Sequence, residues 1–242
     1  MDVRYWGRWF LTVETEMPDL KKITIRNTEH SFDEYRRHIL QVNDPHALIQ
    51  AAGYLKYQCA LKGENVYFRG QDANYQFLTP SLFRKIGRTQ SAQSKISSIK
   101  NKFIKEIIHS CHIFNNINAI AHEPLLQHYG LRTTWIDIVD NIWVALWFAV
   151  HRSHSFGRGG AYLHFERRDQ FKNQKERAFI FLVAVDSQPT KIPGYYAGEN
   201  TEAVDLRVCV PSIFLRPHAQ HGLLFRMRGK GTVRPIDYFP QV

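Results

Sequence analysis

The sequence predicts an α+β fold with a mixed or antiparallel sheet, a buried central helix and a helical N-terminal part. Three observations lead to this fold class. Short β-branched and aromatic runs alternate with helically spaced apolar positions, the run Ala178–Val185 has the pattern of a buried strand, and every residue of Ile142–Val150 is apolar. Because a helix that is hydrophobic all round is a buried one, Ile142–Val150 is expected at the centre of the fold.

The N-terminal third is expected to contain strands and two helices. Residues 3–13 and 22–25 are strand candidates, and residues 32–42 are predicted as a helix because Ser31-Phe32-Asp33-Glu34 has the form of a capping box. A second helix starts at Pro45, the favoured first helical position. Its apolar stripe consists of Leu48, Ile49, Ala52, Leu55 and Cys59.

The middle of the chain begins with a strand at residues 65–71, in which Val66 and Phe68 share one face. A long basic helix is predicted at residues 91–114, and a shorter one ends at Gly130. Residues 133–139 are predicted to form a strand, after which Asp140 or Asn141 is expected to cap Ile142–Val150. The core stripe expected on the long helix is Ile96, Ile99, Phe103, Ile107 and Ile108.

The last third is expected to be mainly strands and loops. Residues 151–160 are predicted as a loop, residues 161–165 as a strand and residues 189–200 as a mobile surface loop. Ala178–Val185 is the predicted buried central strand, and two more strands are expected at 204–208 and 222–227. The chain is therefore predicted to be one domain at residues 63–242, preceded by a strand and helical extension at residues 1–62.

The chain is strongly basic. Its 32 Lys and Arg residues against 22 Asp and Glu give a formal net charge of +10, which favours a nucleotide, a nucleic acid or an acidic protein as partner. An evenly solvated basic surface is the alternative.

The three cysteines form no Cys-x-x-Cys pair, the N-terminus lacks the order of a signal peptide, and the longest apolar run is shorter than the roughly 20 residues of a membrane span. We expect a cytoplasmic protein without a membrane partner.

Two polar positions are candidates for a functional site. Asp137 lies between Ile136 and Ile138, so its carboxylate needs a partner, either in a structural ion pair or in a site. Arg69 ends a strand just before Gly70, where a guanidinium could bind two oxygens and a glycine could admit a phosphate. An arginine tied to an internal carboxylate is the alternative.

The histidines allow a further interpretation. Three His-x-x-His pairs occur, at 109/112, 151/154 and 218/221, but no carboxylate has the spacing of the common zinc motifs, and we predict no metal site. His128 with His218 or His221 could serve as acid and base in metal-free RNA cleavage. No P-loop, Gly-x-Gly-x-x-Gly or Gly-x-Ser-x-Gly motif is present, so ATPase, Rossmann and α/β-hydrolase functions have no support.

Four ordered motifs carry a family resemblance. In chain order the motifs are YFRGQ, LTPSLFR, LLQHYGL with the T, D, N and ALWFA positions that follow it, and RPHAQHGLLF. Together they resemble the FRG domain family, which is named for a tripeptide seen here as Phe68-Arg69-Gly70. The resemblance covers about residues 65–225. It implies that residues 63–242 are an FRG domain and links the chain to bacterial or phage toxin and defence systems.

A second resemblance concerns layout. Toxin-type ADP-ribosyltransferases place an Arg-Gly at the end of an early strand, then a polar strand, then a helix similar to Ala145-Leu146-Trp147-Phe148-Ala149. Their late Glu-x-Glu is absent here, with Gln220 the nearest polar residue and Glu202 a distant substitute. This resemblance implies NAD as the cofactor or substrate. It also implies a site with Asp137 and Gln220 as catalytic residues and with Arg69, Gly70, Arg84, Tyr129 and Thr133 as binding residues.

The expected function is therefore recognition of an NAD-like nucleotide by an effector that acts as an ADP-ribosyltransferase or NAD glycohydrolase. Its expected protein partner is an inhibitor or a target. A metal-free ribonuclease and a non-catalytic basic module that binds nucleic acid or a partner are the alternatives.

Overall fold

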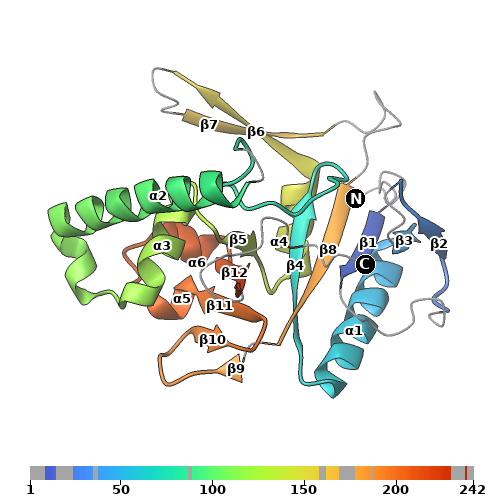
Figure 1. Cartoon of the computed structure of the whole chain (residues 1–242). Coiled ribbons are helices and arrows are strands. Elements are labelled where there is room, and N and C mark those ends of the chain that lie inside the picture. The colour runs from blue at the N-terminus through green and yellow to red at the C-terminus, as the bar shows by residue number, and fades with distance from the viewer. Residues whose placement is uncertain are drawn as a thin grey trace. The chain divides into compact units, whose positions relative to one another are not determined.

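The computed structural model describes residues 9–14, 24–34, 38–86, 89–157, 162–168, 178–186, 188–229 and 238. Contacts divide the chain into two compact units: unit 1 comprises Met1–Gln76 and Asn141–Ala184, and unit 2 comprises Phe77–Asp140 and Val185–Val242. Both contain helices and strands, which confirms the α+β class (Figure 1). The predicted boundary between residues 62 and 63 stays a prediction.

Unit 1 is built on a mixed five-stranded sheet. Its strands are β1 (Trp9–Glu14), β2 (Thr28–Phe32), β3 (His38–Val42), β4 (Asn65–Gln71) and β8 (Ala178–Val185), in the order β2-β3-β1-β8-β4. β1 pairs antiparallel with β3 and parallel with β8. All eight residues of β8 are buried, which confirms the predicted central strand.

The predicted helix at residues 32–42 is wrong. The segment contributes the end of β2 and all of β3, which pair with each other, and β3 also pairs with β1. Ile39, Leu40 and Val42 of β3 are buried. Cross-strand contacts with a segment distant in sequence outweigh the local capping pattern, as tertiary context commonly does.

Helix α1 (Pro45–Leu61) follows as predicted. Asp44 caps it, because its carboxylate accepts hydrogen bonds from the amides of His46 and Ala47 at 2.8 and 3.0 Å. Leu48, Ala52, Leu55 and Cys59 of the predicted stripe are buried, whereas Ile49 is 41% exposed. Strand β4 has the predicted alternation, with Val66 and Phe68 buried.

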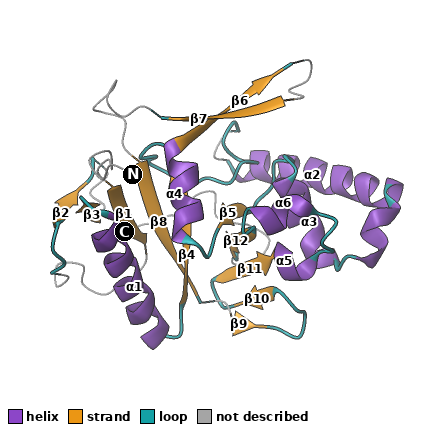
Figure 2. Cartoon of the chain, turned by 180° about the vertical axis from the view of Figure 1, so that it is seen from behind, coloured by secondary structure: helices purple, strands orange, loops and turns teal. Residues whose placement is uncertain are grey.

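Helix α4 (Ile142–Val150) is buried on one side only, which corrects the expectation of burial all round. Ile142, Ala145, Leu146 and Ala149 are buried, and the helix packs along β4 on one face of the sheet (Figure 2). Trp143, Trp147 and Phe148 are more than a third exposed. Asn141 rather than Asp140 caps the helix, accepting from the amide of Trp143 at 2.9 Å.

The segment after α4 is a strand rather than the predicted loop. β6 (His151–Phe156) pairs antiparallel with β7 (Tyr162–Arg167), the strand that the sequence did predict. The cross-strand ladder satisfies the backbone groups of this polar segment, which carries no apolar periodicity from which a strand could be read.

Unit 2 contains a second, antiparallel sheet in the order β5-β12-β11-β10-β9. Its strands are β5 (Ile136–Ile138), β9 (Gln188–Pro189), β10 (Tyr195–Ala197), β11 (Thr201–Asp205) and β12 (Leu223–Met227). The helices are α2 (Gln90–Ser110), η3 (His112–Asn116), α3 (Ala119–His128), α5 (Leu206–Cys209) and α6 (Leu215–Ala219). A core of residues including Phe114, Leu125, Trp135, Val204 and Leu224 joins helices to sheet.

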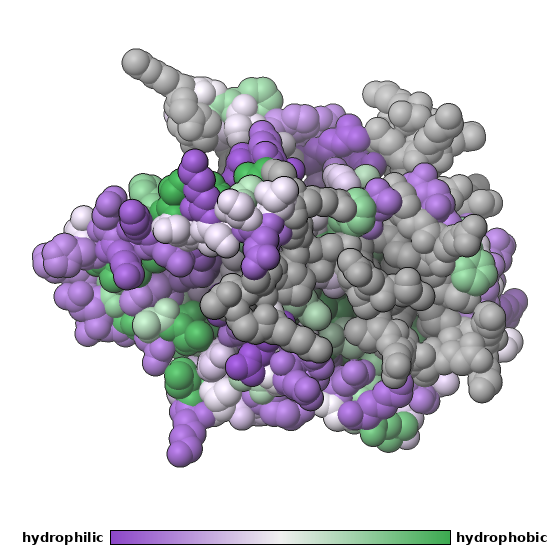
Figure 3. Space-filling model, in the orientation of Figure 1, coloured by the Kyte–Doolittle hydropathy of each residue, from purple (hydrophilic) through white to green (hydrophobic). Residues whose placement is uncertain are grey.

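The predicted helix at 91–114 is divided into α2 and η3. Its predicted core stripe is also partly wrong, because Ile99 and Phe103 are 53% and 49% exposed, whereas Lys100 and Ile104 are buried. Figure 3 shows hydrophobic side chains among hydrophilic ones on the surface at the left, where α2 lies. Burial of Lys100 is possible because its ammonium binds Glu123 at 2.6 Å.

Residues 189–200, predicted as a mobile loop, include the end of β9 and all of β10. The carboxylate of Asp186 accepts hydrogen bonds from the amides of Asn200 and Thr201 at 2.8 and 3.0 Å. Burial opposes ionisation of Asp186, but these donors outweigh it and hold the pKa of the carboxyl below its usual value.

The predicted strand at 204–208 overlaps the end of β11 and continues into α5, while the strand predicted at 222–227 is confirmed as β12.

Candidate functional site

The pairing of β5 with β12 brings together two of the sequence motifs. Leu223 lies opposite Ile138, so the residues just before β12 lie beside those just after β5. His221 precedes β12 and Asp140 follows β5, and Nδ1 of His221 lies 3.1 Å from Oδ1 of Asp140. His221 has a positive φ of 51°, a conformation that few non-glycine residues adopt and that places it at this turn.

Arg207, at the start of α5, holds the Asp140 carboxylate in place. Its guanidinium lies 2.9 Å from Asp140, 2.7 Å from Asp205 and 3.2 Å from Nδ1 of His221. Burial opposes ionisation of Asp140, but the hydrogen bond and charge of Arg207, with His221, outweigh it and lower the pKa of the carboxyl. Asp140 is therefore an anion that can orient the imidazole of His221.

His128 supplies a second imidazole at the end of α3. Its side chain is 7% exposed, and Nδ1 lies 3.8 Å from Oδ1 of Asp137. Nε2 is buried without a hydrogen-bond partner among the residues that the structure describes. A Cβ on Gly222 would lie 2.9 Å from Cε1 of His128, so the ring occupies the space that the glycine leaves.

We call His128, Asp137, Asp140, Arg207 and His221 the histidine site. Three of its side chains are open to solvent: Asp137 is 54% exposed, His221 40% and Asp140 37%. Two imidazoles and two carboxylates within one unit can accept and donate protons, and an exposed carboxylate can stabilise a cation.

Two predicted site residues flank the histidine site in sequence. Tyr129 follows His128, is 51% exposed and places its ring 6.1 Å from that of Phe214. Gln220 precedes His221, and its Oε1 accepts a hydrogen bond from Arg216 Nε at 3.3 Å. The structure thus brings the segments 128–130 and 220–222 together with Asp137, which occupies the exposed face of β5 as the alternation predicted.

Two other predicted binding residues of unit 2 are engaged elsewhere. Thr133 is fully buried; its hydroxyl bonds Gln127, its amide donates to Ser81 Oγ at 3.2 Å, and its carbonyl accepts from the amide of Leu82. Arg84 is exposed and donates from Nε to the carbonyl of Thr79 at 3.0 Å. Thr133 joins three segments of the fold, and a binding role for either residue stays a prediction.

Arg69 and Gly70 belong to unit 1, on β4. The glycine has a structural explanation, because a Cβ there would lie 1.8 Å from the carbonyl oxygen of Ala145 on α4. The bare backbone therefore allows strand and helix to approach closely. Arg69 is half-buried beside this contact, and its predicted phosphate-binding role stays a prediction.

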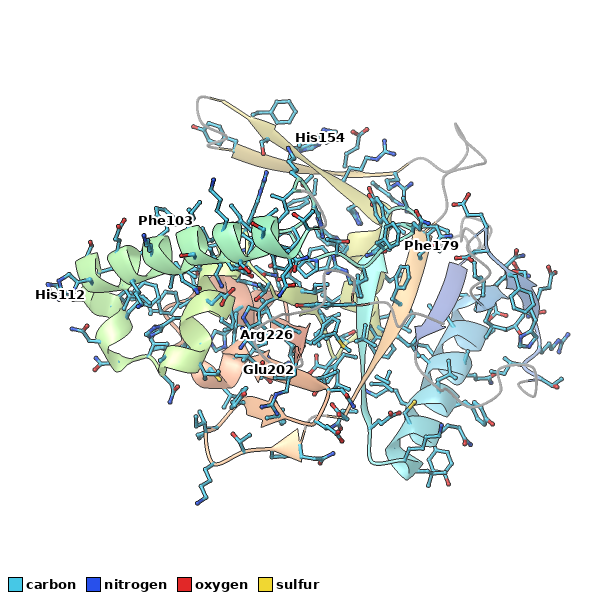
Figure 4. The ribbon with its side chains drawn as sticks, viewed as in Figure 1. Phe103, His112, His154, Phe179, Glu202 and Arg226 are labelled. Carbon is cyan, nitrogen blue, oxygen red and sulfur yellow. The ribbon has the colours of Figure 1, made fainter. Side chains whose placement is uncertain are left out.

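Glu202, considered as a substitute for a catalytic glutamate, belongs to the core of unit 2. It is 5% exposed and binds Arg226 at 2.9 Å and the hydroxyl of Tyr195 at 2.9 Å (Figure 4). Arg226 also lies over the ring of Trp135, with its guanidinium carbon 4.1 Å from the centroid. This arrangement stabilises the interior and leaves no exposed carboxylate at Glu202.

Sequence reasoning missed Asp140 and Arg207 as site residues. Asp140 was interpreted as a possible helix cap, and nothing marked Arg207 apart from its place two residues after Asp205. The antiparallel register of β5 and β12 creates their proximity, and that register follows from pairing between segments about 85 residues apart.

The His-x-x-His pairs do not share helical faces. His109 lies in the last turn of α2 and His112 begins η3, His151 and His154 lie on strand β6, and His221 follows α6 with a backbone in the left-handed region. In the part of the chain that the structure describes, no group of three or more His, Cys, Asp and Glu side chains is arranged to hold a metal ion.

A model of the FRG domain family matches residues 64–158. The match begins one residue before β4 and ends just after β6. It includes His128, Asp137 and Asp140, whereas Arg207 and His221 lie outside it. No curated protein and no solved structure matches the chain. Within the described ranges, no helix has the length and apolar character needed to cross a membrane.

Proposed function

We propose that this chain, whose residues 64–158 match a model of the FRG domain family, binds an NAD-like nucleotide at the histidine site and acts on it as an ADP-ribosyltransferase or NAD glycohydrolase. One observation carries the proposal. The half-exposed carboxylate of Asp137 lies 3.8 Å from the buried imidazole of His128, where the segments 128–130 and 220–222 meet. A solvent-exposed anion held beside a ring nitrogen suits a substrate that develops positive charge.

The chemistry assigns a role to each exposed group. The bond between C1′ of the ribose and the nicotinamide nitrogen breaks, its electron pair leaves with neutral nicotinamide, and the ribose carbon becomes an oxocarbenium ion. The Asp137 carboxylate stabilises that cation until water or an acceptor nucleophile attacks. Tyr129 offers a half-exposed ring on which a base can stack.

In this proposal the protein is an effector of a bacterial or phage toxin or defence system, acting on a target macromolecule and held in check by an inhibitory protein. The family resemblance of the four motifs supports this role. The basic net charge of +10 suits an acidic inhibitor or a polyanionic target.

Nicotinamide release from NAD, with and without total RNA and protein as acceptors, tests the proposal. We expect release by the wild type and a loss of about a hundredfold in Asp137→Asn, which removes the charge and keeps the shape. Arg69→Ala in the same assay tests the sequence-based prediction for unit 1. Glu106→Gln, an exposed carboxylate of α2, is the matched control. Absence of release under every condition, with the protein folded, contradicts the proposal.

The Asp140–His221 pair supports a second candidate function, metal-free RNA cleavage. In the tautomer that donates Nδ1–H to Asp140, Nε2 of His221 carries the lone pair and can take the proton of a ribose 2′-hydroxyl. The 2′-oxygen then attacks phosphorus, the bond to the 5′-oxygen breaks, and His128 as the acid protonates the leaving oxygen. The products are a 2′,3′-cyclic phosphate and a 5′-hydroxyl.

Cleavage of single-stranded RNA in the presence of a chelator tests this second function. His221→Ala is expected to lower the rate by about a hundredfold or more, and Asp140→Asn to lower it less than removal of the base. Cleavage that is unchanged in His221→Ala would assign the activity to other residues.

A further inference from the structure

The β6–β7 hairpin of unit 1 has two chemically different faces. Its register pairs Arg152 with Glu166, His154 with His164, and Phe156 with Tyr162. Because residues directly opposite in an antiparallel pair, and residues two apart on one strand, point to the same side, these six side chains share one face. Figure 4 labels His154 on this hairpin. We call this face the outer face.

The opposite face attaches the hairpin to α4. The ring of His151 stacks on Trp147 with centroids 4.5 Å apart, and Phe165 lies 4.9 Å from the same indole. Nδ1 of His151 lies 2.8 Å from the carbonyl oxygen of Trp147. One large aromatic residue of α4 thus anchors the hairpin from the inner side, and the outer face does not take part in this packing.

The outer face exposes a row of rings. Phe156 and Tyr162, directly opposite each other, are 56% and 72% exposed. The ring of Phe156 also lies 6.3 Å from that of His154 and 6.4 Å from that of His164. Phe156 and Tyr162 are largely surrounded by water and contribute little to folding, and neighbouring exposed rings of this kind mark an interaction surface.

We propose that the outer face binds single-stranded nucleic acid by base stacking. Proteins that bind single strands without sequence preference combine a row of aromatic side chains with positive charge, because every base has a π-face and every nucleotide a phosphate. The outer face supplies the rings, Phe156, Tyr162 and two histidines, and it carries Arg152 opposite Glu166, which also lies 3.4 Å from Nε2 of His154. The chain's net charge of +10 complements a polyanion.

This inference is independent of the proposed function, because it concerns binding by residues of unit 1 and requires no catalytic step. Failure of NAD turnover would leave it intact, and failure of the outer face to bind oligouridine would leave the NAD assignment of the histidine site untouched.

The test is fluorescence anisotropy of a fluorescein-labelled oligouridine of about 16 nucleotides titrated with the full chain. We expect Phe156→Ala and Tyr162→Ala each to weaken binding by about fivefold or more, since each removes one stacking platform. Phe156→Tyr and Tyr162→Phe keep a ring and should bind as the wild type does. Tyr57→Ala, on α1 of the same unit and 61% exposed, is the matched control for loss of an exposed tyrosine.

Three results would overturn the proposal. The wild type binds no oligouridine, the double variant Phe156→Ala/Tyr162→Ala binds as tightly as the wild type, or a duplex RNA of equal length binds as well and is equally sensitive to both alanine variants. In the last case, the outer face recognises something other than unstacked bases. Circular dichroism of each variant shows that the comparison is made between folded proteins.

Discussion

Gly70 shows at the scale of one residue how a motif position can be explained by packing. A Cβ there would lie 1.8 Å from the backbone oxygen of Ala145, and a backbone atom in a packed helix cannot move aside cheaply. We expect Gly70→Ala to lower the free energy of unfolding by about 3 kcal/mol or more, measured by urea denaturation.

Gly53 is the matched control for Gly70→Ala. It lies inside α1, and a Cβ there would meet nothing within 4 Å. Gly53→Ala should therefore raise the stability by about 0.5–1 kcal/mol, the usual gain of alanine over glycine in a helix. A Gly70→Ala protein as stable as the wild type would show that the glycine serves something other than the contact between β4 and α4.

Glu123 leads to a prediction about acid stability. Its burial opposes ionisation, but Lys100 at 2.6 Å and Arg226 at 3.7 Å outweigh it, and the pKa of the carboxyl falls below its ordinary value of 4.5. A carboxyl with a lowered folded-state pKa adds stability that is fully present above pH 4.5 and is lost as the pH falls through the folded value.

Urea unfolding at a series of pH values tests this contribution. Glu123→Gln should lower the stability at neutral pH by about 3 kcal/mol, because it leaves Lys100 buried without its anion. It should also flatten the loss of stability below pH 4.5. The exposed variant Glu106→Gln should keep the acid slope of the wild type. Equal acid slopes for Glu123→Gln and the wild type would place the acid sensitivity in other carboxyls.

Individual polar residues were predictable only where a strand pattern fixed their side. The alternation around Asp137 correctly placed it on the face opposite Ile136 and Ile138. The same reasoning expected a carboxylate near the core, but the exposed face of β5 leaves it half in solvent. Among the residues that the structure describes, the buried carboxylates are Glu202 and Asp205 instead, and Glu202 binds Arg226, a partner from a distant segment that no local pattern identifies.

At the scale of elements, α1 illustrates a helix whose start the sequence determines. Asp44 accepts from two free amides of the first turn, so Asp44→Ala should lower the free energy of unfolding by about 1 kcal/mol in urea denaturation. Asp44→Asn retains a capping oxygen and should stay within a few tenths of a kcal/mol of the wild type. A loss in Asp44→Asn as large as in Asp44→Ala would assign the effect to charge rather than to the cap.

Elements with a strong internal period were predictable, and those formed by pairing were not. The apolar run of β8, the stripe of α1 and the uniform apolar composition of α4 each determine an element locally. Residues 32–42 satisfied a helical pattern yet form strands, because β3 pairs on both sides. Strand β6 is polar and exists through its ladder with β7. Such pairings depend on contacts that a single sequence does not display.

At the scale of the whole molecule, the sequence motifs are distributed between the two units. YFRGQ and ALWFA meet within unit 1 as β4 and α4, where Gly70 and Ala145 are in contact. LLQHYGL and the QHG of the last motif meet within unit 2, where His128 lies against Gly222. The resemblance identified the segments, and the register of β5 with β12 determines which of their side chains form a site.

Titration of the purified chain with NAD in an isothermal calorimeter tests the central claim most directly, because binding precedes any chemistry. We expect saturable binding by the wild type at one site per chain, binding weakened about tenfold or more in Tyr129→Ala, which removes the ring on which a base stacks, and unchanged binding in Glu106→Gln. No heat of binding with the folded wild type, or equal affinity in Tyr129→Ala, would contradict the assignment of the histidine site as a nucleotide site.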